Sequence, residues 1–335
     1  MPRLPERMKL QTSPPLQDRI AEKGHALSAS SFERIVSIDG LRLLAAIGIV
    51  WFHTDGAPYR QIGYASLPIF LLVFFSLITN RSGSAPLAFL KRRSNRLLKP
   101  WLFWSLVYAF FRLAKGLYTR DLDSLRAMLS LKTVLTGTHV HLWYLPYAFV
   151  AAFLVYVLSR RTLRFNHTAV ALIATAAALL MLVAHAMGLF SSRLPSPLPQ
   201  WEFGLPAIPL GFAIGRCLMV PSWWRKRFLL GTIVLVTEVT FLVLTGSGHG
   251  SSVTPYSLAV VLVCLAYCWR TNASVIVATL APLTFGVYLI HPLVILVLKR
   301  TAIASQHCVI FIGLTVCISG LLALGLRQTR LRQFV

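Results

Sequence analysis

The sequence contains few acidic residues. Of 335 residues only 10 are Asp or Glu, whereas 33 are Lys or Arg, and all charged residues together make up 13% of the chain. A soluble domain averages about 25% charged residues. So little polar surface excludes an ordinary cytosolic enzyme, a disordered chain and a disulfide-stapled secreted scaffold. The 56% of hydrophobic residues instead indicates a polytopic membrane protein.

Complete metal-binding patterns and secretion signals are also missing. Cys264 and Cys268 lie one helical turn apart, but no further His or Cys completes a metal spacing, so we expect small core residues and no metal. The first 33 residues are rich in Pro and basic side chains and contain no apolar run of 7–15 residues, which excludes a secretory signal. We expect residues 1–33 to form a mobile cytoplasmic tail.

The net charge of +23 is compatible with two explanations. A strongly basic chain can bind nucleic acid, but we find no nucleic-acid motif and no basic stripe on a soluble fold. Cationic loops of membrane proteins orient the chain against the cytoplasmic leaflet. We therefore expect contact with membrane lipid and no nucleic-acid partner.

Apolar runs predict an all-α fold of about ten transmembrane helices, because each span needs about 20 mostly apolar residues. If the N-terminus is inside, the inside segments hold the larger share of Lys and Arg, which predicts that both termini are cytoplasmic. The membrane domain would cover 34–326, followed by a short cytoplasmic tail, 327–335. The longest external loop, 118–139, is expected to carry a short amphipathic helix. The predicted spans are 38–54, 63–80, 97–117, 140–158, 168–189, 203–220, 228–245, 254–270, 275–298 and 303–326.

The first span carries two ionisable residues, Arg42 and His53. At about 100° per residue, eleven steps return to within roughly 20° of the start, so both side chains lie on one helix face about 16 Å apart along the axis. Ionisable groups inside a membrane are costly and mark function by default. Arg42 could also be a snorkelling anchor and His53 a buried histidine bonded to a neighbouring helix, but their common face favours a functional pair.

A basic cluster, residues 91–99, leads into the third span. Most of its charge is explained as positive flanking on the cytoplasmic side. Arg93 and Arg96 are three residues apart and are expected on one helix face, where their guanidinium groups can bind phosphates. An anionic cytosolic nucleotide is the expected ligand.

Two further segments carry histidines. His139 and His141 precede Trp143 at the start of the fourth span; they would not share a helix face, so we expect only one, His141, to point inward. In the ninth span His291 is followed by Pro292, which removes a helical hydrogen bond. His291 is expected on the same external side as His53. The acids that could orient a histidine are the apparently buried Glu202 and Glu238, and Asp39 and Asp55, which flank the first span.

Together these segments resemble acyltransferase family 3, the integral membrane O-acyltransferases. The resemblance rests on Ile38-Asp39-Gly40-Leu41-Arg42 followed by His53, on Arg-x-x-Arg at 93–96, on the His-Leu-Trp-Tyr-Leu-Pro run at 141–146, and on the Gly-Val-Tyr-Leu-Ile-His-Pro run at 286–292. It covers nearly the whole chain after residue 34. Arg42 with His53 is its most specific part, and Arg-x-x-Arg alone is weak.

The resemblance implies an acyltransferase with no permanently bound cofactor that uses acetyl-CoA, or another acyl-CoA, as co-substrate. His53 would be the catalytic histidine, as a general base or as a carrier of the acyl group, and we favour the general base. Arg42 would be its essential partner. Arg93 and Arg96 would hold the CoA phosphates. Substrate contacts are expected from His141, Trp143, Tyr288 and His291.

The family comparison also suggests the biological role. Members O-acetylate surface glycans, glycolipids or their precursors, so we expect a bacterial inner-membrane enzyme that acts on exopolysaccharide or a lipid-linked sugar, with polysaccharide-assembly proteins as possible partners. No appended extracytoplasmic domain is expected. The second span departs from the family pattern because no Gly follows Ser76, which puts close helix packing there in doubt. An exporter of polysaccharide or lipid-linked sugar is one alternative, since intramembrane Arg and His also suit a solute pathway. A membrane scaffold whose charges only anchor the helices is the other.

Overall fold

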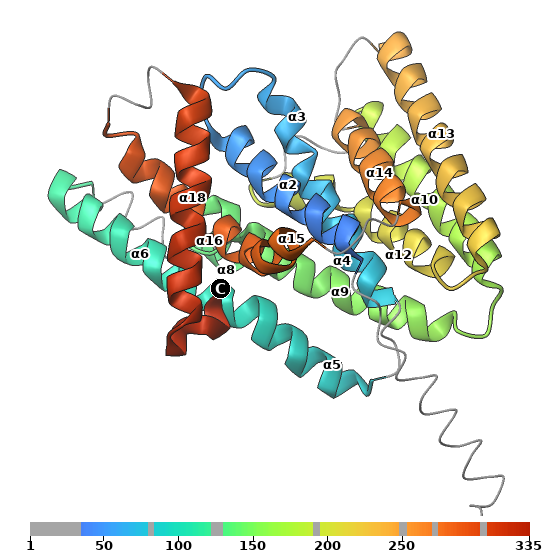
Figure 1. The fold of residues 1–335 in the computed structure, drawn as a ribbon, viewed down its shortest axis with the longest axis horizontal. Coiled ribbons are helices and arrows are strands. Elements are labelled where there is room, and N and C mark those ends of the chain that lie inside the picture. Colours follow the sequence, from blue (N-terminus) through green and yellow to red (C-terminus); the bar gives the residue numbers. More distant parts are fainter. Residues whose placement is uncertain are drawn as a thin grey trace, which may run out of the picture. The chain divides into compact units, whose positions relative to one another are not determined.

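The structure is a computed structural model, and it describes 35–79, 84–121, 130–189, 195–247, 253–269, 274–301 and 307–335. Within these ranges every regular element is a helix and no strand occurs (Figure 1). The all-α prediction is therefore confirmed. The expected N-terminal tail, 1–33, lies outside the described residues.

The helices follow one another through short connections. In chain order the elements are α2 (Val36–His53), α3 (Arg60–Tyr64), α4 (Ser66–Thr79), α5 (Pro86–Arg93), η1 (Ser94–Leu98), α6 (Lys99–Thr119), α8 (Leu131–Thr136), η2 (Val140–Trp143), α9 (Tyr144–Arg161), α10 (His167–Ala186), α11 (Leu198–Gly204), α12 (Ala207–Cys217), α13 (Ser222–Ser247), α14 (Val253–Cys268), α15 (Val275–Leu280), η3 (Ala281–Leu283), α16 (Thr284–Leu298), α18 (Cys308–Arg327) and η4 (Arg330–Phe334).

Seven helical stretches of the described chain are long and apolar enough to cross a bilayer, which makes this a multi-pass membrane protein. The predicted number of ten stays a prediction. α14 has 16 residues and α12 only 11, and α6 carries Lys99, Arg112 and Lys115 along its length. The seven stretches are Val36–His53, Arg60–Thr79, Val140–Arg161, His167–Ala186, Ser222–Leu244, Val275–Leu298 and Cys308–Arg327.

α4 forms the centre of the packed region, and α12 lies against it. The glycines that allow this close approach are on α12. A Cβ atom added to Gly211 would lie 2.6 Å from Cβ of Phe75, and one added to Gly215 would lie 2.7 Å from the carbonyl oxygen of Ser76. Small residues let helix backbones approach each other in membranes. α4 is therefore closely packed although no Gly follows Ser76, because the partner helix supplies the glycines.

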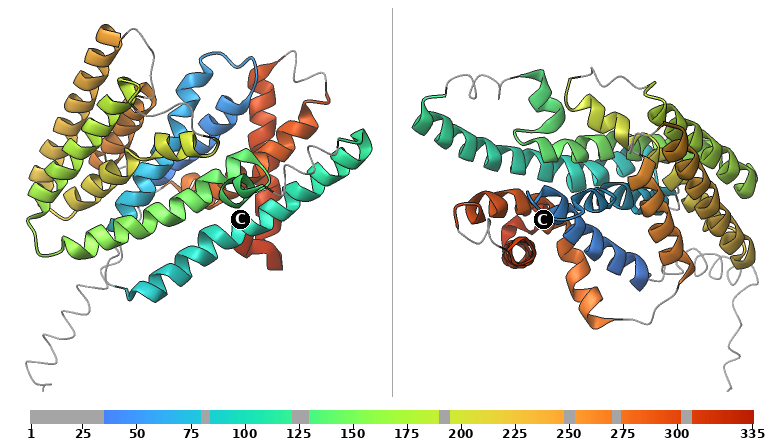
Figure 2. Two further views of the ribbon diagram at one scale, coloured as in Figure 1. Left: turned by 180° about the vertical axis from the view of Figure 1, so that it is seen from behind. Right: turned by 90° about the horizontal axis from the view of Figure 1, so that it is seen from above.

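α5, η1 and α6 run as one continuous ribbon (Figures 1 and 2). The join, η1, is a π-helical turn, in which hydrogen bonds connect residues five apart and one extra residue is accommodated. This turn contains Arg96 and directly follows Arg93, so it determines how the two arginines are presented.

The C-terminal segment packs on the beginning of α6. The ring of Phe334 stacks on Phe103 with centroids 4.3 Å apart, and Trp104 Nε1 donates a 2.9 Å hydrogen bond to the backbone oxygen of Phe334. Lys99 Nζ donates to the side-chain oxygen of Gln333 at 2.7 Å. Residues 330–334, which fall within the predicted tail, thus form a helical turn held against the membrane domain.

The connection between α6 and α9 contains a short helix, α8, as expected. Gly137 ends this helix with φ +72°, a conformation that favours glycine. A Cβ atom at this position would also lie 2.5 Å from Oγ of Ser105 and 3.1 Å from Nε1 of Trp101, both on α6. The glycine therefore lets the chain turn while it touches α6, and this brings the following residues, 138–141, to the site described next.

Candidate active site

Four histidines from three separate segments meet at the end of α2. His53 is the last residue of α2, His291 lies in the middle of α16, and His139 and His141 come from the start of η2. The ring centroids are 5.3 Å apart for His53 and His291, 5.8 Å for His291 and His141, and 4.6 Å for His141 and His139. The structure therefore brings the three predicted histidines together and adds a fourth.

Two tyrosines hold this histidine cluster in place. Tyr288, one turn before His291, donates its hydroxyl hydrogen to the backbone oxygen of His141, which connects α16 to η2. Tyr108 of α6 donates a 2.8 Å hydrogen bond to the backbone oxygen of Leu289, and its ring lies 4.8 Å from His139 and 5.0 Å from His141. Both phenols are buried, so each hydroxyl needs such a partner. The tyrosines thereby fix α6, η2 and α16 around the imidazoles.

The expectation that only one of His139 and His141 points inward is wrong. That expectation assumed a helix, but His139 has an extended backbone (φ −130°, ψ 135°) and only the residues after it are helical. The two rings meet with their Nδ1 atoms 2.6 Å apart, so one of these nitrogens carries the shared proton. The preceding Thr138 is anchored to α6, because its backbone oxygen accepts a 2.8 Å hydrogen bond from Arg112 and its hydroxyl donates a 2.5 Å hydrogen bond to the backbone oxygen of Ser105.

The cluster contains imidazole nitrogens whose hydrogen-bonding capacity is not used. Nε2 of His141 and Nε2 of His291 are buried and have no partner among the described residues. Buried polar atoms are normally paired, and exceptions often mark a catalytic role or a position for a bound molecule. No group of three or more His, Cys, Asp or Glu in the described chain is arranged to hold a metal ion. The arrangement suits proton transfer and hydrogen bonding to a substrate.

Arg42 lies on α2 eleven residues before His53, which on a regular helix places it about 16 Å along the axis and on nearly the same face. Its Nη1 lies 3.4 Å from Oδ1 of Asp39 within the first turns of the helix. The side chain of Arg42 is half-buried. Arg42 therefore lies on nearly the same face of α2 as His53, at the other end of the helix.

The two arginines of the Arg-x-x-Arg motif have different surroundings. The guanidinium group of Arg93 lies 5.1 Å from the ring centre of Phe74 and 5.3 Å from that of Phe89, and its side chain is half-buried. Arg96, on the π-turn, is exposed. Arg93 is thus oriented by aromatic rings, whereas Arg96 is free to approach an anionic ligand from solution.

Trp143, which the family resemblance assigned to substrate contacts, is buried 5.7 Å from the ring of Tyr147. Its only described ring contacts are with Tyr144 and Tyr147, and none is with the histidines. Trp143 therefore supports the start of α9, next to the cluster in sequence.

Of the acids considered as partners for a histidine, Asp55 is paired with cations, Glu238 is exposed, and Glu202 is buried with its Oε1 atom unpartnered among the described residues. Asp55 pairs with Lys299 at 2.6 Å and with Arg60 at 3.8 Å. Glu202 is buried in α11, but Glu238, which looked buried in the sequence, is exposed on α13. None of these carboxylates has a described hydrogen bond or ion pair with a histidine side chain.

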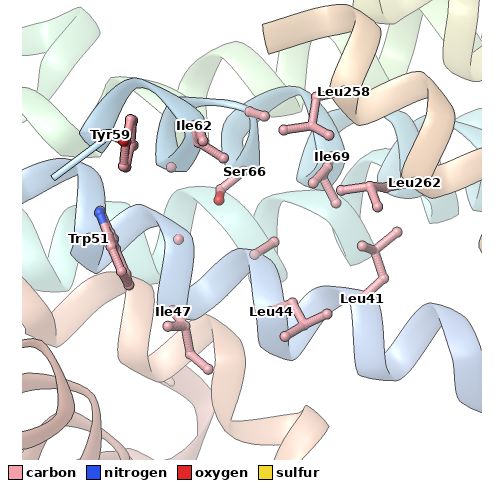
Figure 3. A pocket seen from close by; sticks show the side chains of 14 residues that line it. Leu41, Leu44, Ile47, Trp51, Tyr59, Ile62, Ser66, Ile69, Leu258 and Leu262 are labelled. Atoms are coloured by element: carbon pink, nitrogen blue, oxygen red, sulfur yellow. The ribbon is translucent and has the colours of Figure 1, made fainter. Parts of the chain in front are cut away.

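A separate apolar groove of about 450 Å³ lies between α2, α3, α4 and α14 (Figure 3). Trp51 and Tyr59 border one end and Leu258 and Leu262 the other. The α2 residues in this groove include Leu44 and Trp51, each two positions, or about 200° around the helix, from Arg42 or His53. The groove therefore occupies the opposite side of α2 from the histidines and has no charged residue in its lining.

Sequence reasoning missed two residues of the site. His139 was visible as one half of a His-x-His pair, but the helical geometry assumed for the pair turned it outward. Tyr108 gave no signal, because one tyrosine in an aromatic-rich span has no distinguishing neighbour.

Comparison with known proteins gave one match. A family model described as an acyltransferase domain, of the type called acyltransferase 3, matches residues 35–324, which include every residue of the histidine cluster. No curated protein and no solved structure matched the chain.

Proposed function

The chain belongs to acyltransferase family 3 and is a membrane O-acyltransferase, and on this premise we propose that it transfers an acetyl group from acetyl-CoA to a hydroxyl group of a bacterial surface polysaccharide or its lipid-linked precursor. The observation that carries the proposal is the position of His53. It ends a transmembrane helix, and its ring lies 5.3 Å from that of His291, which belongs to the same cluster as His139 and His141.

The chemistry of the reaction explains the histidine. Acyl transfer from a thioester requires a base that removes the proton of the acceptor hydroxyl as its oxygen attacks the acyl carbon. His53 is half-buried and has no described hydrogen bond that would occupy both ring nitrogens, so it can approach such a hydroxyl. Its neighbours in the cluster offer ring nitrogens that can donate or accept hydrogen bonds and so orient a sugar.

The arginines are the residues proposed to bind the acyl donor, acetyl-CoA. Arg42 lies about three turns from His53 along α2, on the side that charge asymmetry predicts to be cytoplasmic. Arg96 is exposed on the π-turn and Arg93 is held by two phenylalanines. Guanidinium groups bind phosphates through paired hydrogen bonds. We assign Arg93 and Arg96 to the phosphates of CoA, and Arg42 to the path between them and His53.

The cellular location of the enzyme follows from where its two substrates are found. An enzyme that receives acyl-CoA from the cytosol and a glycan from the opposite side would reside in the bacterial inner membrane. Polysaccharide-assembly proteins would then deliver or remove the acceptor.

The test uses purified protein in detergent with labelled acetyl-CoA and a panel of glycan acceptors. Wild-type protein should transfer label to a glycan, and His53→Ala should reduce the rate by at least about 100-fold, the lower range for loss of a general base. His185→Ala is the matched control, because His185 is a half-buried histidine of α10 that contacts the backbone of Glu202 and lies in a different part of the fold.

Both variants should keep the wild-type unfolding temperature within a few degrees. Transfer by His53→Ala at the wild-type rate would show that His53 is not catalytic. Movement of a glycan across proteoliposomes without acetyl-CoA, and without any label transfer, would instead show that the chain is an exporter.

A further inference from the structure

The neighbouring residues His291 and Pro292 of α16 both affect the hydrogen bonding of one backbone carbonyl, that of Tyr288. Proline has no N–H group, so the carbonyl four residues before it, that of Tyr288, loses its helical hydrogen bond. Nδ1 of His291 lies 2.8 Å from this oxygen and 3.2 Å from the oxygen of Val287. Since carbonyl oxygens only accept hydrogen bonds, Nδ1 must carry the proton. Pro292 thus leaves the carbonyl oxygen of Tyr288 without a helical donor, and the side chain of His291 donates to it instead.

This hydrogen bond fixes the tautomer of His291. A neutral imidazole with its proton on Nδ1 has a lone pair on Nε2. The side chain is completely buried and Nε2 has no partner among the described residues. An unpaired acceptor at this depth has a substantial free-energy cost unless another group donates to it. Nε2 of His291 is thus a buried hydrogen-bond acceptor that has no donor among the described residues.

His53 is positioned to be that donor. Its ring centroid lies 5.3 Å from that of His291 with the rings inclined at 34°. At this separation the nearest ring nitrogens can be joined by a hydrogen bond, directly after a small ring rotation or through one water molecule. Hydrogen bonds of catalytic groups often tighten only when substrate is bound.

We propose that His291 is a positioning residue for His53: Nε2 of His291 accepts the N–H of His53, so that the other ring nitrogen of His53 presents its lone pair to the acceptor hydroxyl. The inference rests on the proposed function and deepens it. In a catalytic triad a carboxylate performs the corresponding task. Here a neutral imidazole performs it, and a backbone carbonyl freed by proline fixes that imidazole.

The proton and electron balance of the step is simple. The free nitrogen of His53 takes the proton of the acceptor hydroxyl, the hydroxyl oxygen forms a bond to the acyl carbon, and the carbon–sulfur bond breaks to release the CoA thiolate. His53 is then an imidazolium whose second N–H still donates to His291. The proton taken from the hydroxyl passes from His53 to the thiolate sulfur, and His291 neither gains nor loses a proton.

No described carboxylate competes for this task. Asp55 is the acid nearest to His53 in sequence, and its oxygens are paired with Lys299 and Arg60. Asp39 is paired with Arg42 at the other end of α2. The titratable and charged groups in electrostatic range of His53 are Asp55, Arg60, Lys299, His139, His141 and His291.

The first experiment compares His291→Leu with His291→Gln in the full-length protein. Leucine fills the space without an acceptor, whereas the amide oxygen of glutamine can accept the hydrogen bond of His53. We expect kcat to fall about 100-fold in His291→Leu with KM for acetyl-CoA unchanged, and to recover to within about 10-fold of wild type in His291→Gln. His185→Leu, the control, should retain wild-type kcat.

The pH profile separates positioning from simple structural support. Without its acceptor the imidazolium of His53 is less stable, so the acidic limb of kcat/KM should move to lower pH in His291→Leu and return toward wild type in His291→Gln. Equal losses in both variants with an unmoved acidic limb would overturn the proposal, as would wild-type kcat in both.

A second measurement does not depend on turnover. In protein labelled with ¹⁵N-histidine, the signals of His53, assigned by their loss in His53→Ala, should report a single tautomer in wild type and a mixture in His291→Leu. A mixture already present in wild type would overturn the positioning role whatever the activity. Absence of acyl transfer by wild-type protein together with a single tautomer would overturn the proposed function but not the arrangement of the two rings.

Discussion

The ammonium group of Lys299 donates a 2.6 Å hydrogen bond to the carboxylate of Asp55, just beyond the ends of α16 and α2. These two helices carry His291 and His53, the two imidazoles that the proposed mechanism requires to be adjacent. The ion pair is exposed, with about half to three quarters of each side chain accessible. It therefore connects α2 and α16 at the surface, where pH and salt act on it.

Asp55→Asn should lower stability modestly, by at most about 1 kcal/mol, because exposed ion pairs are weak and screened by salt. Lys299 lowers the pKa of Asp55 through its hydrogen bond and charge. A lowered carboxyl pKa contributes stability above the unfolded pKa, and that contribution is lost as pH falls through the folded one. Thermal unfolding in detergent should show that Asp55→Asn is less stable than wild type at pH 7 in low salt, and equally stable at high salt or at strongly acidic pH. A loss of stability that did not change with salt or pH would contradict the ion-pair explanation.

Gly215→Ala should destabilise the protein by about 1–3 kcal/mol, the usual cost of overpacking. The added Cβ would lie 2.7 Å from the backbone oxygen of Ser76 and 2.5 Å from Cβ of Thr79, so α12 and α4 must separate. Gly231→Ala is the control, since no atom lies within 4 Å of its added Cβ and alanine favours helix by roughly 1 kcal/mol. Equal unfolding temperatures for the two variants would mean that α12 does not constrain α4.

Arg96→Ala should raise KM for acetyl-CoA about 10-fold with little change in kcat, because a hydrogen bond to a charged group contributes about 1.5–3 kcal/mol. Steady-state kinetics at several salt concentrations would measure it. Arg92→Ala is the matched control, because Arg92 is also exposed, directly precedes the motif in α5, and donates from its Nε to the backbone oxygen of Ala88. An equal rise in KM for acetyl-CoA in both variants would show that Arg96 contributes no more than any other flanking charge.

Tyr288→Phe should lower kcat while leaving the fold intact. The lost hydroxyl leaves the buried backbone oxygen of His141 without its donor, which frees η2 to shift by a fraction of an ångström. Tyr267→Phe removes a comparable buried hydroxyl, one bonded at 2.6 Å to Ser76 in a different part of the bundle. We expect similar losses in the free energy of unfolding from the two changes, on the order of 1–3 kcal/mol, and a slower reaction only from Tyr288→Phe. Equal rates would exclude η2 from the site.

Much of the fold could be predicted from the sequence because apolar length alone decides whether a segment can be a membrane helix. The same reasoning identified His53, His141 and His291, since an ionisable residue in an apolar run stands out. The helical position of His53 followed from a spacing of eleven residues. These inferences depend only on local periodicity, which the structure preserves in α2 and α16.

The rest required contacts that sequence does not encode locally. His139 was placed on a helix, but the positive φ of Gly137 and the anchoring of Thr138 to α6 give it an extended backbone instead. Tyr108 belongs to the site only because α6 crosses beside α16, where its hydroxyl finds the oxygen of Leu289. Both depend on how distant segments meet.

Helical spacing also gave too simple an account of the Arg-x-x-Arg motif. Three steps on an α-helix would place Arg93 and Arg96 on one face with equal access. The chain instead enters a π-turn after Arg93, and one arginine is held by aromatic rings while the other is exposed. Periodicity predicts positions on a regular helix, and it gives no warning of where regularity ends.

The π-turn at 94–98 gives this region a tolerance to a change in chain length. Because it accommodates one residue more than an α-turn, deleting Leu97 or Leu98 would return the segment to a regular α-helix while α5 keeps its orientation relative to α6. Arg93 and Arg96 would then stand three steps apart on a regular helix, on one face. A one-residue gap just after Arg96 in an alignment of relatives would thus indicate two arginines with equal access, even though the motif letters are identical.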